Sequence, residues 1–104
     1  MKVYDSVDPS EEGVLVPDFV LRLAVGESLV AASILEVTVS GGSDPSALTR
    51  FGAPTISGTT LLIPFAGLVD GCTYFGRVSV TTTNAFNTPV WGFKLPCQVA
   101  SQAP

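Results

Sequence analysis

The chain reads Leu68-Val-Asp-Gly71-Cys-Thr-Tyr74-Phe-Gly-Arg-Val78-Ser-Val80, and this stretch decides its fold. Gly71 precedes Tyr74 by three residues, and apolar and polar positions then alternate. Alternation is typical of a half-buried β-strand, and a corner glycine before a tyrosine is typical of the entry to a core strand in a β-sandwich. We predict a structural corner at Leu68, Gly71 and Tyr74, with the Tyr74 hydroxyl bonded to nearby backbone, and a core face that contains Cys72, Tyr74, Gly76, Val78 and Val80.

Shorter segments with strand patterns lie on both sides of this strand. They are residues 18–25, 29–40, 54–57, 59–63 and 90–99, and residues 47–51 fit either a short strand or a single helical turn. Gly58 is expected to turn the hairpin between the third and fourth of these. The sequence therefore predicts an all-β domain, a single immunoglobulin- or fibronectin-III-like β-sandwich of about seven strands at residues 14–99. An acidic N-terminal arm without regular structure is expected at residues 1–13, and a C-terminal tail at 100–104.

The alternation also assigns the core faces of the other strands. The expected inward residues are Phe19, Leu21, Leu23 and Val25, then Leu35, Val37 and Val39, and finally Trp91, Phe93, Leu95 and Cys97. Trp91 is expected to pack under Tyr74. Glu36 should face outward, and Pro96 indicates an edge strand or a bulge because proline has no N–H to donate.

Composition limits the classes of partner. The 104 residues carry a net charge of −4, and only 13% of them are charged while 46% are hydrophobic. The five basic residues are scattered singly, so no basic stripe for nucleic acid is expected. So little charge indicates either that apolar surface meets a partner or that abundant Thr and Ser supply the polarity.

The sequence around the start of the chain, Met1-Lys-Val-Tyr-Asp5, reaches acidic residues before any apolar run long enough for a signal peptide. No later run approaches the ~18 apolar residues of a membrane span, so we expect synthesis in a cytoplasm and no membrane contact. Two cysteines, Cys72 and Cys97, are then expected to be free buried thiols. They would also lie opposite each other if residues 72–83 and 90–99 form an antiparallel hairpin, and a disulfide is the second alternative.

Most common active sites are excluded by residue content. The chain has no histidine, so Ser-His-Asp, Cys-His and His-containing zinc sites cannot form. Two cysteines cannot make a four-cysteine zinc centre, and the glycines match no phosphate-binding loop. We expect no enzymatic activity and no cofactor.

Acidic and aromatic residues remain as candidates for binding. The acidic residues of the arm are Asp5, Asp8, Glu11 and Glu12. They could surround a calcium ion, form a solvated arm, or lie on a basic neighbour. The aromatic residues outside the expected core face are Phe51, Phe75 and Phe86. Phe75 beside Arg77 fits a sugar platform, but a protein–protein contact is the plainer interpretation. The sequence thus predicts an interface on the arm and near Phe75 and Arg77, with Phe86 as a further candidate.

From Asp8 to Pro96 the chain resembles small immunoglobulin-like virion proteins of tailed bacteriophages. The residues that carry the likeness are Asp8-Pro9-Ser10-Glu11, Asp18-Phe19, Gly26-Glu27-Ser28, Gly52-Ala-Pro54-Thr-Ile-Ser-Gly58-Thr, Gly67, Gly71, Tyr74, Val80-Thr-Thr-Thr83 and Leu95-Pro96. The resemblance implies a non-enzymatic structural part of a phage particle, most often a head decoration (cement) protein and less often a head-fibre or tail-associated piece. The extra N-terminal residues and the Cys72/Cys97 pair depart from the pattern and leave the position in the particle open.

The expected partner is therefore a major capsid protein or another virion protein, with self-association as a further expectation. The expected location is the virion, after synthesis in the bacterial cytoplasm. Many weak contacts repeated over a lattice would stabilise the shell. The alternative is a carbohydrate-binding or adhesive module on a head fibre or tail, which would use Phe75 and Phe86.

Overall fold

Within residues 1–99, which the computed structural model describes, the chain forms seven β-strands and two short 3₁₀ turns. The strands are β1 (Lys2–Val3), β2 (Gly13–Leu15), β3 (Leu29–Ser40), β4 (Thr55–Ser57), β5 (Thr60–Phe65), β6 (Thr73–Thr82) and β7 (Val90–Pro96). The 3₁₀ turns are η1 (Val20–Arg22) and η2 (Ala47–Arg50). The tail expected at residues 100–104 lies outside the described residues.

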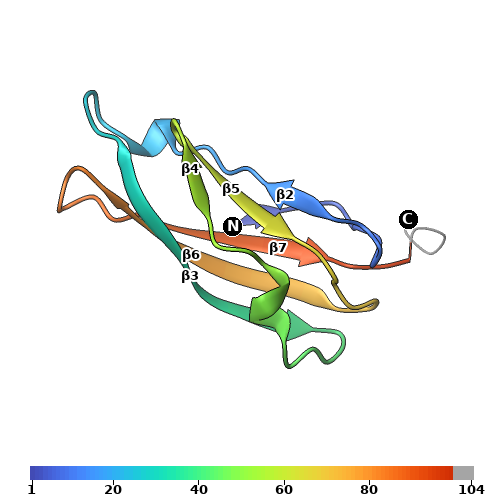
Figure 1. Cartoon of the computed structure of the whole chain (residues 1–104). Helices are drawn as coiled ribbons and strands as arrows, with labels where there is room; N and C mark the ends of the chain where they lie inside the picture. The colour runs from blue at the N-terminus through green and yellow to red at the C-terminus, as the bar shows by residue number, and fades with distance from the viewer. Residues whose placement is uncertain (100–104) are drawn as a thin grey trace.

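The strands form two sheets that face each other (Figure 1). The larger sheet has the order β1-β7-β6-β3 and the smaller one the order β2-β5-β4. The antiparallel hairpin of β6 and β7 lies at the centre of the larger sheet and pairs Tyr74 with Leu95 and Gly76 with Phe93. The prediction of an all-β sandwich is confirmed. The molecule is elongated, with extents of 46 × 24 × 19 Å, so its loops gather at two distant ends.

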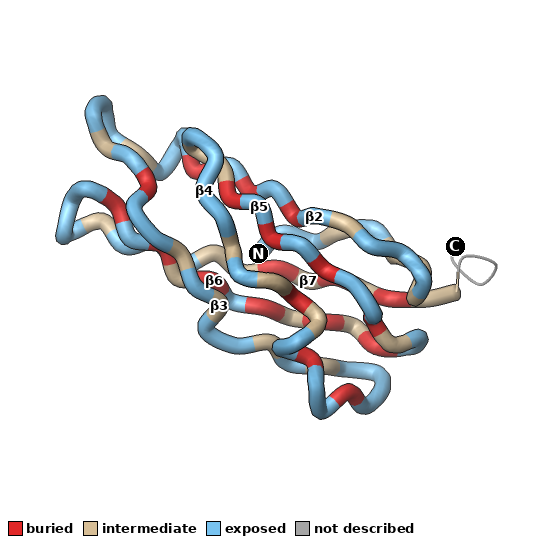
Figure 2. The backbone as a smooth tube through the Cα atoms, viewed as in Figure 1, coloured by how far each residue is buried: buried red, intermediate tan, exposed pale blue. Residues whose placement is uncertain are grey.

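The core lies between the sheets, and β6 shows how the sequence produces it. Every second residue of β6 is buried, which confirms the core face expected for this strand (Figure 2). Gly76 belongs to this row because the Phe93 ring fills the space beside it. A Cβ added to Gly76 would lie 2.1 Å from Cε2 of that ring. Each fully buried side chain of this size contributes about 1.5–3 kcal/mol, so the central hairpin supplies much of the stability.

The local predictions around the turns are also confirmed. Gly58, with a φ of 62°, turns the chain between β4 and β5, where only glycine adopts this conformation at low cost. Residues 47–50 form a helical turn, η2, rather than a strand. The Tyr74 hydroxyl accepts a hydrogen bond of 2.9 Å from the backbone N–H of Val69, which is the corner bond expected from the sequence.

The strand expected at residues 18–25 does not form. The carboxylate of Asp18 accepts a hydrogen bond of 3.0 Å from the N–H of Val20, and this local bond turns the backbone into η1. Phe19 is buried as expected and Leu23 packs against the core, but Leu21 and Val25 are exposed. The alternating pattern was therefore wrong for two of its four core positions.

The long strand β3 corrects one face assignment. Its pairing with β6 shifts in register between Ile34 and Glu36, so the chain bulges there and Leu35 is half exposed rather than inward. Val37 and Val39 still pack against the core. Glu36 faces outward as expected and pairs across the strands with Arg77.

The N-terminal arm is more ordered than its composition indicates. β1 pairs in parallel with β7, and Val7 forms a further bridge to Cys97. β7 therefore has a neighbour on each side, and Pro96 lies in an interior strand rather than at an edge. Pro96 has no N–H to donate, but its carbonyl accepts a hydrogen bond of 3.1 Å from the N–H of Val7.

Two aromatic assignments are also wrong. Phe51, which was left outside the core, is buried, and its ring centroid lies 5.9 Å from that of Tyr74 and 5.3 Å from that of Phe93. Trp91 does not pack under Tyr74. It pairs with Val78, four residues further along β6, and its ring contacts Phe93 and Tyr4.

Candidate functional site

The residues proposed for an interface lie in three separate places. The acidic arm residues lie where β7 ends and β2 begins, Phe75 and Arg77 lie on β6, and Phe86 lies in the loop between β6 and β7 at the opposite end (Figure 1). The stretch of β6 from Phe75 to Thr82 alone extends about 23 Å. Phe75 and Phe86 therefore do not form one stacking platform.

At the acidic end, the chain bonds mainly to itself. The Asp8 carboxylate accepts hydrogen bonds from the N–H and the hydroxyl of Ser10, at 2.9 and 2.7 Å. Asp70 lies at the same end and accepts a hydrogen bond of 3.1 Å from the N–H of Val99. Among residues 1–99 no three acidic, histidine or cysteine side chains are grouped so that they would hold a metal ion.

On the outer face of the larger sheet, Phe75 and Arg77 take part in ordinary cross-strand pairs. Phe75 pairs with Lys94, whose ammonium lies 5.8 Å from the Phe75 ring centroid. Arg77 pairs with Glu36, and its Nη1 lies 3.3 Å from Glu36 Oε1. Both charged side chains of the ion pair are more than half exposed, so the pair contributes little to stability. Phe75 and Arg77 thus have cross-strand partners within the sheet itself.

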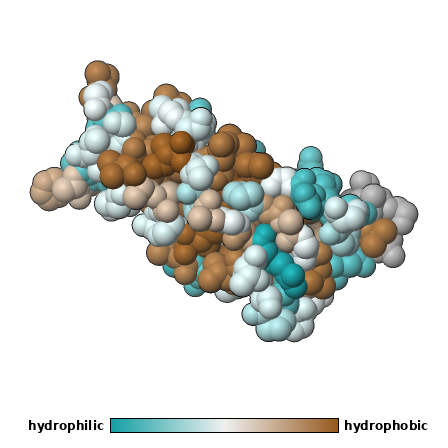
Figure 3. Space-filling view, viewed as in Figure 1, coloured by the Kyte–Doolittle hydropathy of each residue, from teal (hydrophilic) through white to brown (hydrophobic). Residues whose placement is uncertain are grey.

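The third place is an apolar end, which we define as Leu21, Val25 and Phe86. Leu21 and Phe86 each expose 97% of their surface, and Val25 is fully exposed. The half-exposed side chains of Val20, Val30 and Val90 extend the apolar surface beyond the tip. In Figure 1 the loop after η1 and the β6–β7 loop project from this end as two separate tips, and Figure 3 shows hydrophobic atoms at this end and many polar atoms at the opposite end. Three large apolar side chains that are almost fully exposed at one end of the molecule make this end the candidate interaction surface.

The loops of the apolar end are fixed by a hydrogen-bond network. The side-chain amide of Asn87 donates to the carbonyl of Arg22 at 2.8 Å and to Glu27 Oε1 at 3.1 Å, which joins the two loops. Asn84 accepts a hydrogen bond from the N–H of Phe86 at 3.0 Å. These bonds order the backbone of the loops that carry the exposed apolar side chains, and an ordered loop lowers the entropy cost of binding.

The charged residues at this end are both used within the molecule. Arg22 donates from Nη1 to the carbonyl of Val90 at 3.2 Å and lies over the ring of Phe19. Glu27 Oε1 accepts a hydrogen bond of 2.6 Å from the N–H of Ala24. That backbone bond, with weaker bonds from Asn84 and Asn87, lowers the pKa of Glu27 below its usual value. The charges thus order the loops and leave the tip itself to apolar side chains.

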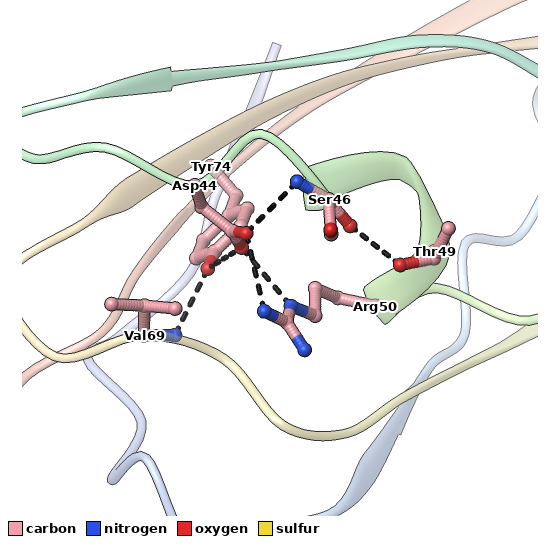
Figure 4. Close-up of polar contacts among 6 residues, drawn as sticks. All are labelled: Asp44, Ser46, Thr49, Arg50, Val69 and Tyr74. Atoms are coloured by element: carbon pink, nitrogen blue, oxygen red, sulfur yellow. Dashed lines mark hydrogen bonds and ion pairs between the residues drawn. The ribbon is translucent and has the colours of Figure 1, made fainter.

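A second polar cluster lies at the corner that Val69 and Tyr74 form, and it has a structural role (Figure 4). Asp44, whose side chain is buried, accepts hydrogen bonds from Arg50 Nε and Nη2 at 3.1 and 3.2 Å and from the Tyr74 hydroxyl at 2.6 Å. The N–H of Ser46 donates to it as well, at 3.1 Å. The carboxylate therefore ties the loop after β3 and the turn η2 to the core strand β6.

The same contacts shift the protonation equilibria of the cluster. The hydrogen bonds from Arg50, then from Tyr74, lower the pKa of Asp44 below its usual value although burial opposes this. Burial, followed by the Asp44 contact, raises the pKa of Tyr74 to about 12. The cluster is thus stable with Asp44 ionised and Tyr74 protonated, over the whole neutral range.

Sequence reasoning found part of these sites. Tyr74 and Phe86 were singled out, but Leu21 and Val25 were assigned to the core, and Asp44 was not singled out. The Asp-Pro-Ser sequence at residues 44–46 is a turn signal, but nothing in it indicates that Arg50 and Tyr74 would meet the carboxylate.

No family model, no curated protein and no solved structure matches the chain. Residues 1–99 contain no helix that has the length and apolar character needed to cross a bilayer. The candidate site therefore rests on its own geometry.

Proposed function

We propose that this chain is a non-enzymatic structural protein of a bacteriophage particle that binds the capsid surface as a decoration protein and stabilises the shell. The observation that carries the proposal is the apolar end, where Leu21, Val25 and Phe86 are exposed on loops that hydrogen bonds from Asn87 join to each other. The phage-type resemblance of residues 8–96 supplies the class of particle. The exposed apolar end supports the choice of docking surface.

The distribution of charge supports an end-on orientation. The acidic residues of the arm and Asp70 lie at the end opposite the apolar tip, where Figure 3 shows hydrophilic atoms. An apolar tip gains free energy when a protein surface covers it, whereas a cluster of carboxylates remains favourable in water. The apolar end would therefore face the shell and the acidic end the solvent. The net charge of −4 would also reduce association between free copies of the protein.

The small size of the tip is compatible with a stable attachment because a shell presents many copies of the same site. A single contact through the end of a narrow sandwich would bury less than the ~1,200 Å² of a standard interface. Contacts between neighbouring decorators, or across capsid subunit boundaries, would add to it when they repeat over the lattice.

Charged substitutions at the tip test the docking surface. The triple variant Leu21→Asp, Val25→Asp, Phe86→Asp is expected to lower occupancy on shells assembled without this protein at least about tenfold, because hot-spot contacts at a partner pocket would be lost. Its melting temperature should stay near that of the parent, since these side chains make little contact within the folded chain. The measurement is cosedimentation of purified protein with the shells.

Two matched variants locate the effect. Leu48→Asp places a charge at a half-exposed apolar residue of η2, away from the tip, and should bind as the parent does. Glu11→Ala with Glu12→Ala removes charge from the arm. Normal binding of the tip variant, together with lost binding of the arm variant, would move the interface to the arm and contradict the proposed orientation.

A further inference from the structure

Cys72 and Cys97 lie opposite each other at the end of the central hairpin. The last regular pair of β6 and β7 is Thr73 with Pro96, and the N–H of Cys97 then donates to the carbonyl of Cys72 at 2.9 Å. Gly71, with a φ of 84°, donates to the carbonyl of Cys97, also at 2.9 Å. Gly71 and Cys72 together therefore oppose Cys97, which is a β-bulge with glycine in its left-handed position. The register that the sequence predicted for these two cysteines is confirmed.

The two side chains also share a face. Both cysteines are free thiols, and both are 99% buried on the core side of the larger sheet. Residues opposite each other on antiparallel strands have Cα atoms about 4.5–5.5 Å apart, within the about 4.4–6.8 Å range of disulfides. The backbone therefore needs no rearrangement to join them.

One side-chain rotation is required. A Cβ added to Gly42 would lie 2.7 Å from Sγ of Cys72, so this sulfur leans toward the loop after β3 and away from β7. Rotation of Cys72 about χ1 moves the sulfur toward Cys97, and exchange between staggered rotamers is a small local change.

We propose that Cys72 and Cys97 form a modification site, at which the reduced thiols of the newly made protein are oxidised to an intramolecular disulfide by a low-molecular-weight disulfide. One thiol loses its proton and attacks the small disulfide, which releases one small thiol and leaves a mixed disulfide on the protein. The second protein thiolate then displaces the other small thiol. One small disulfide is reduced to two thiols while the protein loses two electrons and two protons, so the exchange balances.

The folded protein controls the rate of this exchange. Both sulfurs are covered, so attack requires local opening at the end of β7, where Cys97 is held by single bonds from its neighbours and by the bridge to Val7. Burial, and to a smaller extent the nearby carboxylate of Asp70, raises the pKa of Cys97 to about 11. The reactive thiolate is therefore scarce at neutral pH. The thiols would therefore survive in a reducing cytoplasm and close slowly in an oxidising medium. This timing rests on the proposed function, whereas the disulfide itself does not.

Closure would lock the acidic end of the molecule. Cys72 follows the corner turn, in which Gly71 is held by Cys97, and Val7 joins the N-terminal segment to Cys97. A disulfide at this point would tie together the strand ends of β6 and β7 and the segment after β1. The cross-link would also constrain the unfolded chain between two residues that are 25 positions apart.

The test uses the isolated full chain, so its failure leaves the docking proposal untouched. Purified reduced protein is incubated with excess oxidised glutathione at alkaline pH and then alkylated under denaturing conditions, and its mass is measured by mass spectrometry. The expected product is a monomer lighter by two hydrogen atoms with no alkylated cysteine, and its melting temperature should rise on the order of 10 °C. Added dithiothreitol should reverse both changes.

Two outcomes would overturn the proposal. Alkylation of both cysteines after the same treatment in mild urea, which opens strand ends without unfolding the chain, would show that the pair cannot close. An oxidised monomer whose melting temperature equals that of the reduced protein would show that the bond locks nothing. The variants Cys72→Ser and Cys97→Ser should each stop at a glutathione adduct, and peptide mapping of the oxidised parent supplies the same assignment if a variant does not fold.

Discussion

Replacing Asp44 by alanine is expected to lower the free energy of unfolding by about 3 kcal/mol. The substitution leaves the Tyr74 hydroxyl without the carboxylate that it reaches at 2.6 Å, and Arg50 without its ion-pair partner. Losing one partner of a buried charged network is costly because the remaining groups keep their desolvation penalty. The estimate lies at the lower end of the range for buried pairs because the Arg50 side chain is 32% exposed and water reaches it.

The control for this loss is the exposed ion pair on the outer face of the sheet. Glu36→Ala removes the carboxylate that pairs with Arg77, and there the cost should stay below about 1 kcal/mol. Urea denaturation of the parent and the two variants measures the difference. Equal losses for Asp44→Ala and Glu36→Ala would contradict the role given to the buried cluster.

The pH dependence of the same variant adds a second readout. The pKa of Asp44 is lowered in the folded protein, so its stabilisation is fully present above the unfolded value of about 4 and is lost as the pH falls through the folded value. The pKa of Tyr74 is raised to about 12 in the folded protein. The stabilisation from the protonated Tyr74 hydroxyl is therefore fully present below its unfolded pKa of about 10 and is lost as the pH rises through the pKa of the folded protein. Asp44→Ala should therefore flatten the acid limb of the stability profile.

Gly76→Ala is expected to cost about 3 kcal/mol or more, because the new methyl group would overlap the ring of Phe93. The added Cβ would lie 2.1 and 2.2 Å from two ring carbons, and Phe93 is fully buried at the centre of the core. Strand propensity alone predicts the opposite sign, since alanine is better than glycine in a strand by roughly 0.5–1 kcal/mol. The sign of the measured change therefore separates packing from propensity.

Gly92→Ala is the matched control in the neighbouring strand. Its added Cβ would meet its nearest neighbour, the carbonyl oxygen of Gly76, at 3.6 Å, which is an ordinary contact, so its cost should be below about 1 kcal/mol. A compensating substitution, Phe93→Leu, should make the combined loss with Gly76→Ala smaller than the sum of the two single losses. A Gly76→Ala protein as stable as Gly92→Ala would contradict the packing described for the hairpin.

The parts of the fold that the sequence predicted are those that local patterns determine. The alternation in β6 holds because both of its neighbours are strands of the same sheet, and Gly58 turns its hairpin because of its own backbone conformation. The prediction of a strand at residues 18–25 was wrong because the N–H of Val20 donates a hydrogen bond to the carboxylate of Asp18, and this local bond competes with an extended backbone. β1 was missed because it is two residues long and forms only by pairing with a distant strand.

The candidate site comes from one of these failures. Leu21 and Val25 have the spacing of core residues, and their exposure became visible only once η1 had replaced the expected strand. Residues that match a core pattern but are fully exposed in the structure are therefore candidates for a docking surface. The buried cluster is harder to foresee, because Asp44 and Tyr74 are separated by 30 residues and meet through the tertiary fold.

Quantitative mass spectrometry of purified particles from the source tests the central claim most directly. The measured quantity is the abundance of this chain relative to the major shell subunit. A decoration protein that covers the head predicts near-stoichiometric abundance, with occupancy lost in particles that carry the tip variant. Absence of the chain from purified particles would contradict the account, and an abundance of a few copies per particle would contradict the decoration role in favour of a fibre or tail part.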